Sequence, residues 1–180
     1  MRIVFIISFV INVILAVVAL VLCPGNVASH FGAGGDPNGW APAYVNALIM
    51  TGVNLLIFVS FFFTPHLIRI TPSRWINLPN KEYWLREENK KRMESMLTAH
   101  MYPFGTLTFV FMFLVGLLAL QANLSNPIRL REDLFWWPFG FYMAYTAYWT
   151  IKIMLVFRVP KEELRQAFPL KAVQTFFCIA

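Results

Sequence analysis

The stretch IVFIISFVINVILAVVALVLC, residues Ile3–Cys23, decides the fold class. It contains no Asp, Glu, Lys or Arg, and its strongly polar side chains are those of Ser8 and Asn12. About 20 apolar residues cross the hydrocarbon core of a bilayer as an α-helix. The stretch therefore predicts a membrane-spanning helix close to the start of the chain.

Three further apolar stretches follow, at about residues 42–65, 103–121 and 134–157. The chain is 58% hydrophobic and 13% charged, whereas soluble proteins average about 25% charged residues. We therefore expect one all-α domain over residues 1–180, an integral membrane four-helix bundle. Its remaining parts would be an outer loop (24–40), a cytoplasmic loop (66–100) and a cytoplasmic tail (158–180).

The basic residues are distributed unequally between the connections. Of the 15 Lys and Arg residues, all except Arg129 and Arg131 lie before the first stretch, between the second and third, or at the end of the fourth and beyond it. Lys and Arg accumulate on the cytoplasmic side of membrane proteins. Both termini are therefore expected in the cytoplasm. This orientation, with the lipid bilayer as partner, accounts for the net charge of +6 and argues against nucleic acid.

The cytoplasmic loop carries a dense group of charged residues. Acid–base pairs four residues apart stabilise an exposed helix, and the pairs here are Glu82/Arg86, Glu87/Lys91 and Glu88/Arg92. They predict a helix over about 81–99 on the membrane surface, preceded by Asn80 and with Tyr83 and Trp84 turned toward lipid or the bundle. His66 and His100 flank this loop as a candidate metal-binding or pH-sensing pair. The simpler role is bonding to helix-end carbonyls.

Four polar side chains fall inside the first two helices. Asn12 and Asn54 match in depth near the middle of the membrane, and Ser8 and Ser60 match nearer the cytoplasm. Such residues in lipid usually form hydrogen bonds to a neighbouring helix. We therefore expect interhelical contacts here, with a polar transport path as the alternative.

The fourth helix carries an aromatic stripe, Tyr142, Tyr145, Tyr148 and Trp149. Positions three apart lie on one face of a helix. The stripe is a candidate docking face for a partner helix, and a cofactor or quinone site is the alternative.

The outer loop contains the glycine-rich segment HFGAGGDPNGW, residues 30–40. Asp-Pro-Asn-Gly predicts a reverse turn in which Gly39 takes a positive φ. We expect a structural cap in which His30 bonds the backbone and Trp40 anchors the second helix, and the alternative is a recognition or metal site. The candidate residues are His30, Gly35, Asp36, Pro37, Asn38, Gly39 and Trp40.

Known chemical motifs do not fit this segment. Pro37 occupies the sixth position of a dinucleotide-type pattern that starts at Gly32, and no Lys-Ser/Thr pair follows to make a phosphate loop. His30 and Asp36 supply two metal ligands, fewer than a zinc site needs. No metal, cofactor or catalytic residue is therefore expected.

Two blocks resemble a known family. The first combines Pro24, Val27, His30, Phe31, Gly35, Pro37, Gly39 and Trp40, and the second is the segment Asn77–Leu85. Together they resemble the bacterial membrane domain of unknown function that is found in SdpI-type immunity proteins, in a short, four-helix form. The resemblance implies a multi-helix protein of the bacterial inner membrane without established catalysis.

The leading functional hypothesis is a small non-catalytic membrane protein that acts by protein interaction, in a sensory or immunity-like role through its outer loop. The first alternative is an accessory subunit of a larger membrane complex, docked through the fourth helix. The second is a transporter or channel module built on the Asn12 and Asn54 path.

Overall fold

The computed structural model describes residues 1–160 and 163. The chain is mostly helical, and its longer elements are α1 (Arg2–Leu22), β1 (Asn26–Phe31), β2 (Pro37–Pro42), α2 (Ala43–Phe62), α3 (Thr64–Ile70), α4 (Lys81–Trp84), α5 (Glu87–Leu124) and α6 (Glu132–Val156). Short 3-10 turns lie at Ala33–Gly35 and Ser73–Trp75. In this part of the chain, three helices are long and apolar enough to cross a membrane: α1, α2 and α5.

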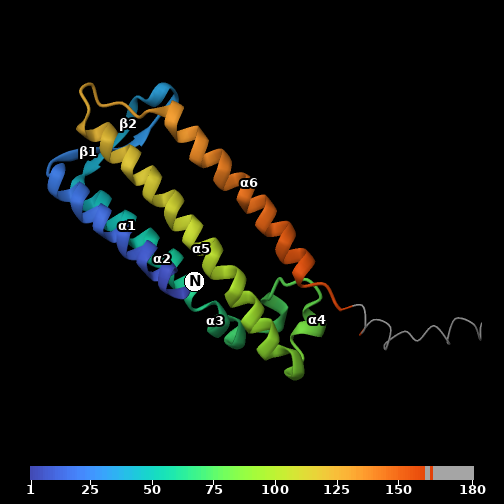
Figure 1. Cartoon of the computed structure of the whole chain (residues 1–180). Coiled ribbons are helices and arrows are strands. Elements are labelled where there is room, and N and C mark those ends of the chain that lie inside the picture. The colour runs from blue at the N-terminus through green and yellow to red at the C-terminus, as the bar shows by residue number, and fades with distance from the viewer. Residues whose placement is uncertain (161–162, 164–180) are drawn as a thin grey trace, which may run out of the picture.

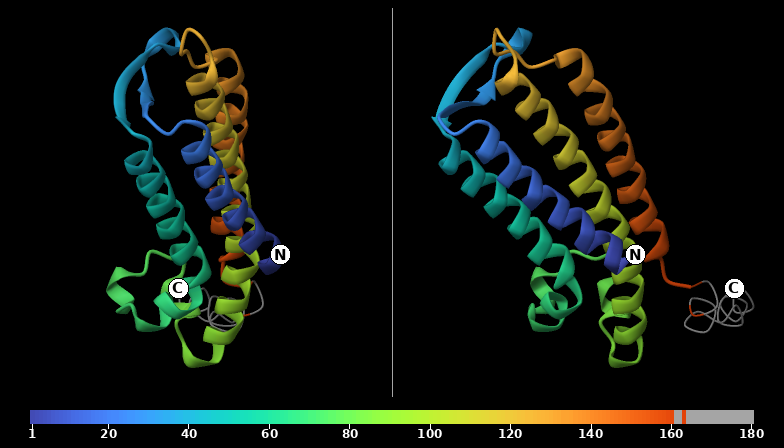
Figure 2. Two further views of the ribbon diagram at one scale, coloured as in Figure 1. Left: turned by 90° about the vertical axis from the view of Figure 1, so that its left-hand side faces the viewer. Right: turned by 60° about the vertical axis from the view of Figure 1, so that its left-hand side comes forward.

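The long helices lie side by side, with α1 against α2 and α5, and with α6 against α5 (Figure 1). The β1–β2 hairpin and the α5–α6 connection, residues 125–131, lie together at one end of the bundle, which we call the hairpin end. The N-terminus, α3 and α4 lie at the other, the N-terminal end (Figure 2). The chain therefore separates its two irregular regions by the full length of the bundle.

An aromatic cluster packs the bundle toward its N-terminal end. Phe5 of α1 is fully buried, and its ring stacks on Phe58 of α2 at 5.3 Å and contacts Tyr102 and Phe109 of α5 at 5.4 Å each. Gly105 makes this close approach possible, because a Cβ there would lie 2.6 Å from a carbon of the Phe5 ring. Three helices are thus joined around one phenylalanine.

The third helix differs from the prediction. The sequence predicts a surface helix over 81–99 and a separate span from Pro103, but α5 runs unbroken from Glu87 to Leu124 with Pro103 inside it. Proline removes the backbone donor that would bond the carbonyl of Ala99 four residues earlier, and it crowds the preceding turn. Here α6 contacts both sides of the proline: Trp149 Nε1 donates to the His100 carbonyl at 3.1 Å, and Tyr142 Oη lies 3.1 Å from Thr108 Oγ1.

The outer segment also differs from the prediction, since it forms a two-stranded antiparallel sheet rather than a loop. The expected turn at Asp36–Gly39 is wrong. The chain turns at Gly32–Asp36, where Gly34 and Gly35 take φ of +85° and +79° and Gly32 N donates to Asp36 O at 2.8 Å. Adjacent glycines supply this left-handed conformation without a steric penalty, which leaves Gly39 in β2, paired with His30.

The end of the chain lies mostly outside the described residues. The predicted tail over 158–180 includes residues 161–162 and 164–180, and with them Lys161, Arg165, Lys171 and Cys178. Helix α6 ends at Val156, one residue before the predicted boundary.

Candidate functional site

The hairpin is attached to α5 by one side chain. Asn123 Oδ1 accepts from Ala28 N at 2.7 Å, and Asn123 Nδ2 donates to Ala28 O at 3.1 Å. The amide therefore pairs with Ala28 as a neighbouring strand would, and Ala28 is 3% exposed. The sequence does not mark Asn123 as a residue that holds the outer segment. Its one signal is an amide placed at the end of an apolar stretch.

A second attachment holds the tip of the turn. Leu130 N donates to Gly35 O at 2.8 Å, and Arg129 Nε donates to Gly34 O at 2.7 Å. Arg129 also lies 3.6 Å from Asp36 Oδ1. The α5–α6 connection thus holds the turn that joins β1 to β2, and Gly35 and Asp36 of the predicted motif take part in this contact.

Three of the other motif residues are exposed, while Pro37 and Gly39 are partly buried and His30 also lines the space beneath the hairpin. His30, Asn38 and Trp40 are exposed, and Trp40 keeps 52% of its surface accessible. His30 Nδ1 lies 3.1 Å from Ser29 Oγ rather than at a backbone group as predicted. Within residues 1–160 and 163, no group of three or more His, Cys, Asp or Glu side chains could hold a metal ion.

A cavity of about 700 Å³ lies beneath the hairpin. Ligand sites in proteins range over about 300–1,000 Å³. The cavity is walled by α1, α2 and α5, by the inner side of β1 and by the first turns of α6, and most of its wall is apolar. No sequence pattern indicates this cavity, because it arises from how several elements pack together. Its polar lining residues include Asn12, Asn46, Asn54 and Asn123.

The polar residues predicted inside the first two helices have different partners. Asn12 Nδ2 donates to Ser8 O of its own helix and to Phe109 O of α5, each at 2.9 Å. Asn54 Nδ2 donates to Met50 O at 2.8 Å within α2, and its buried Oδ1 has no partner among the described residues.

The two serines bond within their own helices. Ser8 Oγ donates to Phe5 O at 2.8 Å, and Ser60 Oγ donates to Leu56 O at 2.7 Å. Of the four predicted polar residues, Asn12 is therefore the one with a hydrogen bond between helices in the described part of the chain.

This difference gives opposite expectations for the two asparagines. Asn12→Leu should lower the free energy of unfolding by about 0.6–1.7 kcal/mol, because it removes a hydrogen bond between helices. Asn54→Leu should raise it, because it removes a buried acceptor without a partner. The double variant should show the sum, since the two amides have no shared partner. Reversible unfolding in detergent micelles measures all three, and a loss from Asn54→Leu equal to that from Asn12→Leu would contradict this assignment.

The predicted cytoplasmic motif positions the end of α6. Asn80 Nδ2 donates to the Phe157 carbonyl at 3.0 Å, and Trp84 Nε1 donates to the same oxygen at 2.9 Å. The Trp84 and Phe157 rings meet edge to face at 5.3 Å, and both side chains are buried with Tyr83. Asn80 has a φ of +53°, a conformation that Asn tolerates better than most residues. The motif therefore fixes α6 to the start of α5.

The aromatic stripe of α6 packs mainly within the chain. Tyr142 stacks on Phe111 at 4.5 Å, and Trp149 stacks on Phe104 at 4.3 Å, with Tyr145 stacked on the same ring at 6.1 Å. Three of the four predicted docking residues therefore pack against α5 of the same chain. Tyr148 is 55% exposed.

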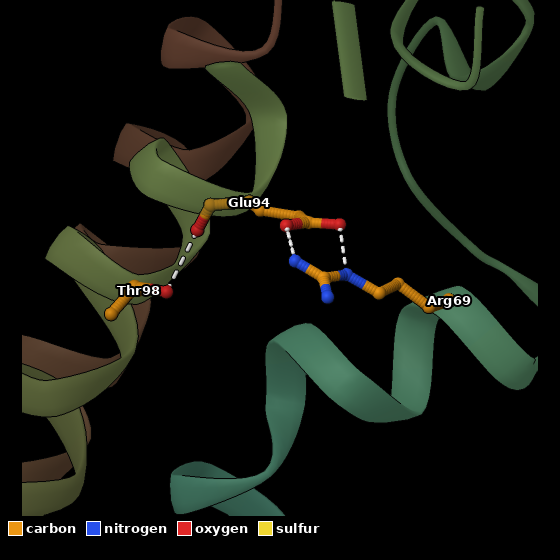
Figure 3. Close-up of polar contacts among 3 residues, drawn as sticks. All are labelled: Arg69, Glu94 and Thr98. Atoms are coloured by element: carbon orange, nitrogen blue, oxygen red, sulfur yellow. Dashed lines mark hydrogen bonds and ion pairs between the residues drawn. The ribbon is translucent and has the colours of Figure 1, made fainter. Parts of the chain in front are cut away.

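An ion pair joins α3 to α5 at the N-terminal end (Figure 3). Arg69 Nε donates to Glu94 Oε1 at 2.6 Å, and Arg69 Nη2 donates to Oε2. A helix of 38 residues is about 57 Å long against a bilayer core of about 30 Å, so this charged first part of α5 projects beyond the spanning part. His66 is exposed, whereas His100 Nδ1 lies 2.7 Å from Met96 O, in line with the helix-carbonyl role.

The ion pair predicts a dependence of stability on pH. The hydrogen bonds from Arg69 lower the pKa of Glu94 below its ordinary value of 4.5. The unfolded chain then binds the proton more readily, so the pair stabilises the fold above pH 4.5 and loses this effect as the pH falls through the lowered pKa. The melting temperature should exceed that of Glu94→Gln at pH 7, and the difference should vanish in acid. A constant difference across this range would contradict the assignment.

A family model described as a domain of unknown function (DUF1648) matches residues 7–55. The match covers most of α1, the whole hairpin and α2 as far as Leu55, and it includes Asn12 and Asn54. It agrees with the resemblance to a membrane domain of unknown function, while the link to SdpI-type immunity proteins stays a hypothesis. No curated protein and no solved structure matches the chain.

Proposed function

We propose that this chain is a non-catalytic four-helix protein of a bacterial cytoplasmic membrane that binds a protein partner at its hairpin end. In this proposal α6 is the fourth span, since its 25 residues reach about 37 Å. The hairpin end faces the outside, and both termini face the cytoplasm. The basic residues of the α2–α5 connection support that orientation.

The observation that carries the proposal is a hairpin whose backbone is bonded to the helices while several of its side chains remain exposed. Asn123 and Leu130 fix the backbone of the hairpin at Ala28 and Gly35, while His30, Asn38 and Trp40 remain exposed. A surface ordered before binding loses less conformational entropy when a partner docks. The Asn123 amide beneath the hairpin holds the backbone of Ala28, a structural role that fits a binding surface.

The accessory-subunit alternative rests on a different surface. Helix α6 packs along α5, and its opposite face is exposed at Tyr148, Ile151 and Met154. A second membrane protein docked there would approach from within the bilayer rather than from outside.

Cross-linking in cells separates these two functions. A photoreactive amino acid at Trp40 should give a discrete protein adduct that disappears in a Gly35→Ala background, where the hairpin is no longer held. The same group at Tyr148 should react with lipid. An adduct from Tyr148 alone would favour the accessory subunit. If the partner is a toxin, deletion of the gene should also make the cell sensitive to it.

The orientation is tested by accessibility of single cysteines in a background lacking Cys23. Cysteines at Asn38 and Asn126 should react with a membrane-impermeant thiol reagent in intact cells, because both positions are exposed at the hairpin end. A cysteine at Glu88, an exposed position at the start of α5, should react after the membrane is permeabilised. Labelling of the Glu88 variant alone in intact cells would invert the orientation.

A further inference from the structure

We infer that the cavity beneath the hairpin binds a neutral, mostly apolar small molecule through hydrogen bonds to Asn46 and Asn54. The volume of about 700 Å³ suits a drug-sized molecule. Both residues line the cavity from α2. The ligand site shares His30 with the exposed side of the hairpin, but its ligand bonds Asn46 and Asn54 and does not depend on a protein partner.

Small residues keep the cavity open. Ala16 and Ala19 of α1 and Gly116 of α5 line it where larger side chains would fill it. Packing also favours glycine at position 116, because a Cβ there would lie 2.8 Å from Leu15 Cδ2. The space is partly open, because its lining includes Met50 and Trp136, which are 39% and 59% exposed, so a ligand can reach it from outside the bundle.

Two of the four asparagines on the wall form hydrogen bonds to other elements of the fold, and the other two have hydrogen-bonding groups without a partner among the described residues. Asn12 and Asn123 bond backbone groups of other elements. Asn54 is 4% exposed, and its Oδ1 has no partner in the described part of the chain. Asn46 is partly buried, and its side chain forms no hydrogen bond to any described residue, so the buried group without a partner on this wall is Asn54 Oδ1. A buried polar group without a partner is costly, and a ligand that enters the cavity would supply one.

The spacing of the α2 residues defines the shape of the ligand. Asn46, Met50 and Asn54 are four residues apart, all line the cavity, and therefore form a polar–apolar–polar stripe on one helix face. The two amides lie about 12 Å apart along the helix axis. An elongated molecule can thus bond at one or both ends while its apolar middle packs on Met50.

The polar groups of the wall define the chemical class. An asparagine amide both donates and accepts, so it suits a hydroxyl, phenol or amide. Glu132, at the first turn of α6, is the one charged residue among the described lining residues. An anionic ligand would lose its hydration in the cavity with no Lys or Arg side chain among the described lining residues, and the mostly apolar wall disfavours a cation, for which Glu132 is the one counter-charge. The ligand class is therefore a neutral apolar molecule with a hydroxyl or amide group.

The test uses Cys23, which lines the same cavity, as a reporter. The protein carries Cys178→Ser, is purified in lipid nanodiscs and is alkylated with N-ethylmaleimide. The probes are 1-naphthol and 1-methylnaphthalene, which differ by a hydroxyl in place of a methyl group, at equal concentrations in the bilayer. We expect 1-naphthol to slow alkylation of Cys23 at a concentration about five- to tenfold below that of 1-methylnaphthalene, the factor for about one hydrogen bond.

Four substitutions identify the contacts. 1-Naphthol carries one hydroxyl and can bond one of the two amides at a time, so the Asn46→Leu/Asn54→Leu double variant should raise its half-protection concentration to that of 1-methylnaphthalene, and the two single variants show which amide it uses. Ser60→Ala, on the same helix outside the cavity, should change neither half-protection concentration. Ala47→Phe, which fills the cavity, should abolish protection by both probes, and the asparagine variants carry the test if it does not fold. Equal protection by both probes in the unsubstituted protein would overturn the inference, as would full protection by 1-naphthol in the double asparagine variant. Cross-linking at Trp40 is unaffected by this result, so the two proposals fail independently.

Discussion

Asn123→Ala should lower the free energy of unfolding by about 2–4 kcal/mol. The substitution leaves both the N–H and the C=O of Ala28 without partners, and a buried backbone group that loses its partner costs about 1–3 kcal/mol. Ala28 is 3% exposed, so water does not readily replace the amide. Equilibrium unfolding in detergent micelles measures the loss. Hydrogen exchange at Ala28 should also rise in the folded protein.

The matched control for this substitution is Gln121→Ala. Gln121 lies in the same turn of α5, is exposed, and forms no side-chain hydrogen bond among the described residues. Its replacement should change stability by less than about 0.5 kcal/mol. Equal effects at the two positions would show that Asn123 does not hold the hairpin.

Gly35→Ala should release the turn from the α5–α6 connection. A Cβ at Gly35 would lie 2.1 Å from the Leu130 carbonyl oxygen, a contact that backbone atoms must move to relieve. The φ of +79° adds about 1–2 kcal/mol for any residue with a Cβ. We expect a total loss of about 3 kcal/mol or more once overpacking is included. Limited proteolysis at residues 30–40 should become fast in this variant.

Gly25→Ala tests whether the effect is specific to this turn. Gly25 precedes β1, a Cβ added to it would have no atom within 4 Å, and its φ is not positive. The variant should keep the stability and the protease resistance of the parent protein. Rapid cleavage of both variants would mean that the segment opens for another reason.

The membrane helices could be predicted because their signal is local. A helix that crosses a bilayer must be apolar over its whole length, so α1 and α2 are visible in the sequence to within a few residues. A local signal also explains why the sequence wrongly predicts a separate helix that starts at Pro103. Proline favours the first turn of a helix and so predicts a helix start there, whereas α5 continues through it and is contacted on both sides of the proline by α6, which is distant in sequence.

The hairpin end could not be predicted because its contacts are distant in sequence. The turn depends on Gly34 and Gly35 rather than on the stronger Asp-Pro-Asn-Gly signal, and the register depends on Asn123, which lies 95 residues after Ala28. The cavity likewise needs several elements in place before it exists. The residues of the glycine-rich segment could be identified, but the sequence alone does not divide them into those that hold the hairpin and those that face outward.

The contacts of α6 on both sides of Pro103 have a mechanical consequence. Sharp kinks in long helices are commonly located at proline. Trp149 and Tyr142 of α6 contact α5 on the two sides of Pro103. We therefore expect the two halves of α5 to move together as one rigid unit. Asn123 lies near one end of α5 and Glu94 lies near the other. A pull on the hairpin would therefore tilt α5 as a unit and strain the Arg69–Glu94 pair at the opposite side of the bundle.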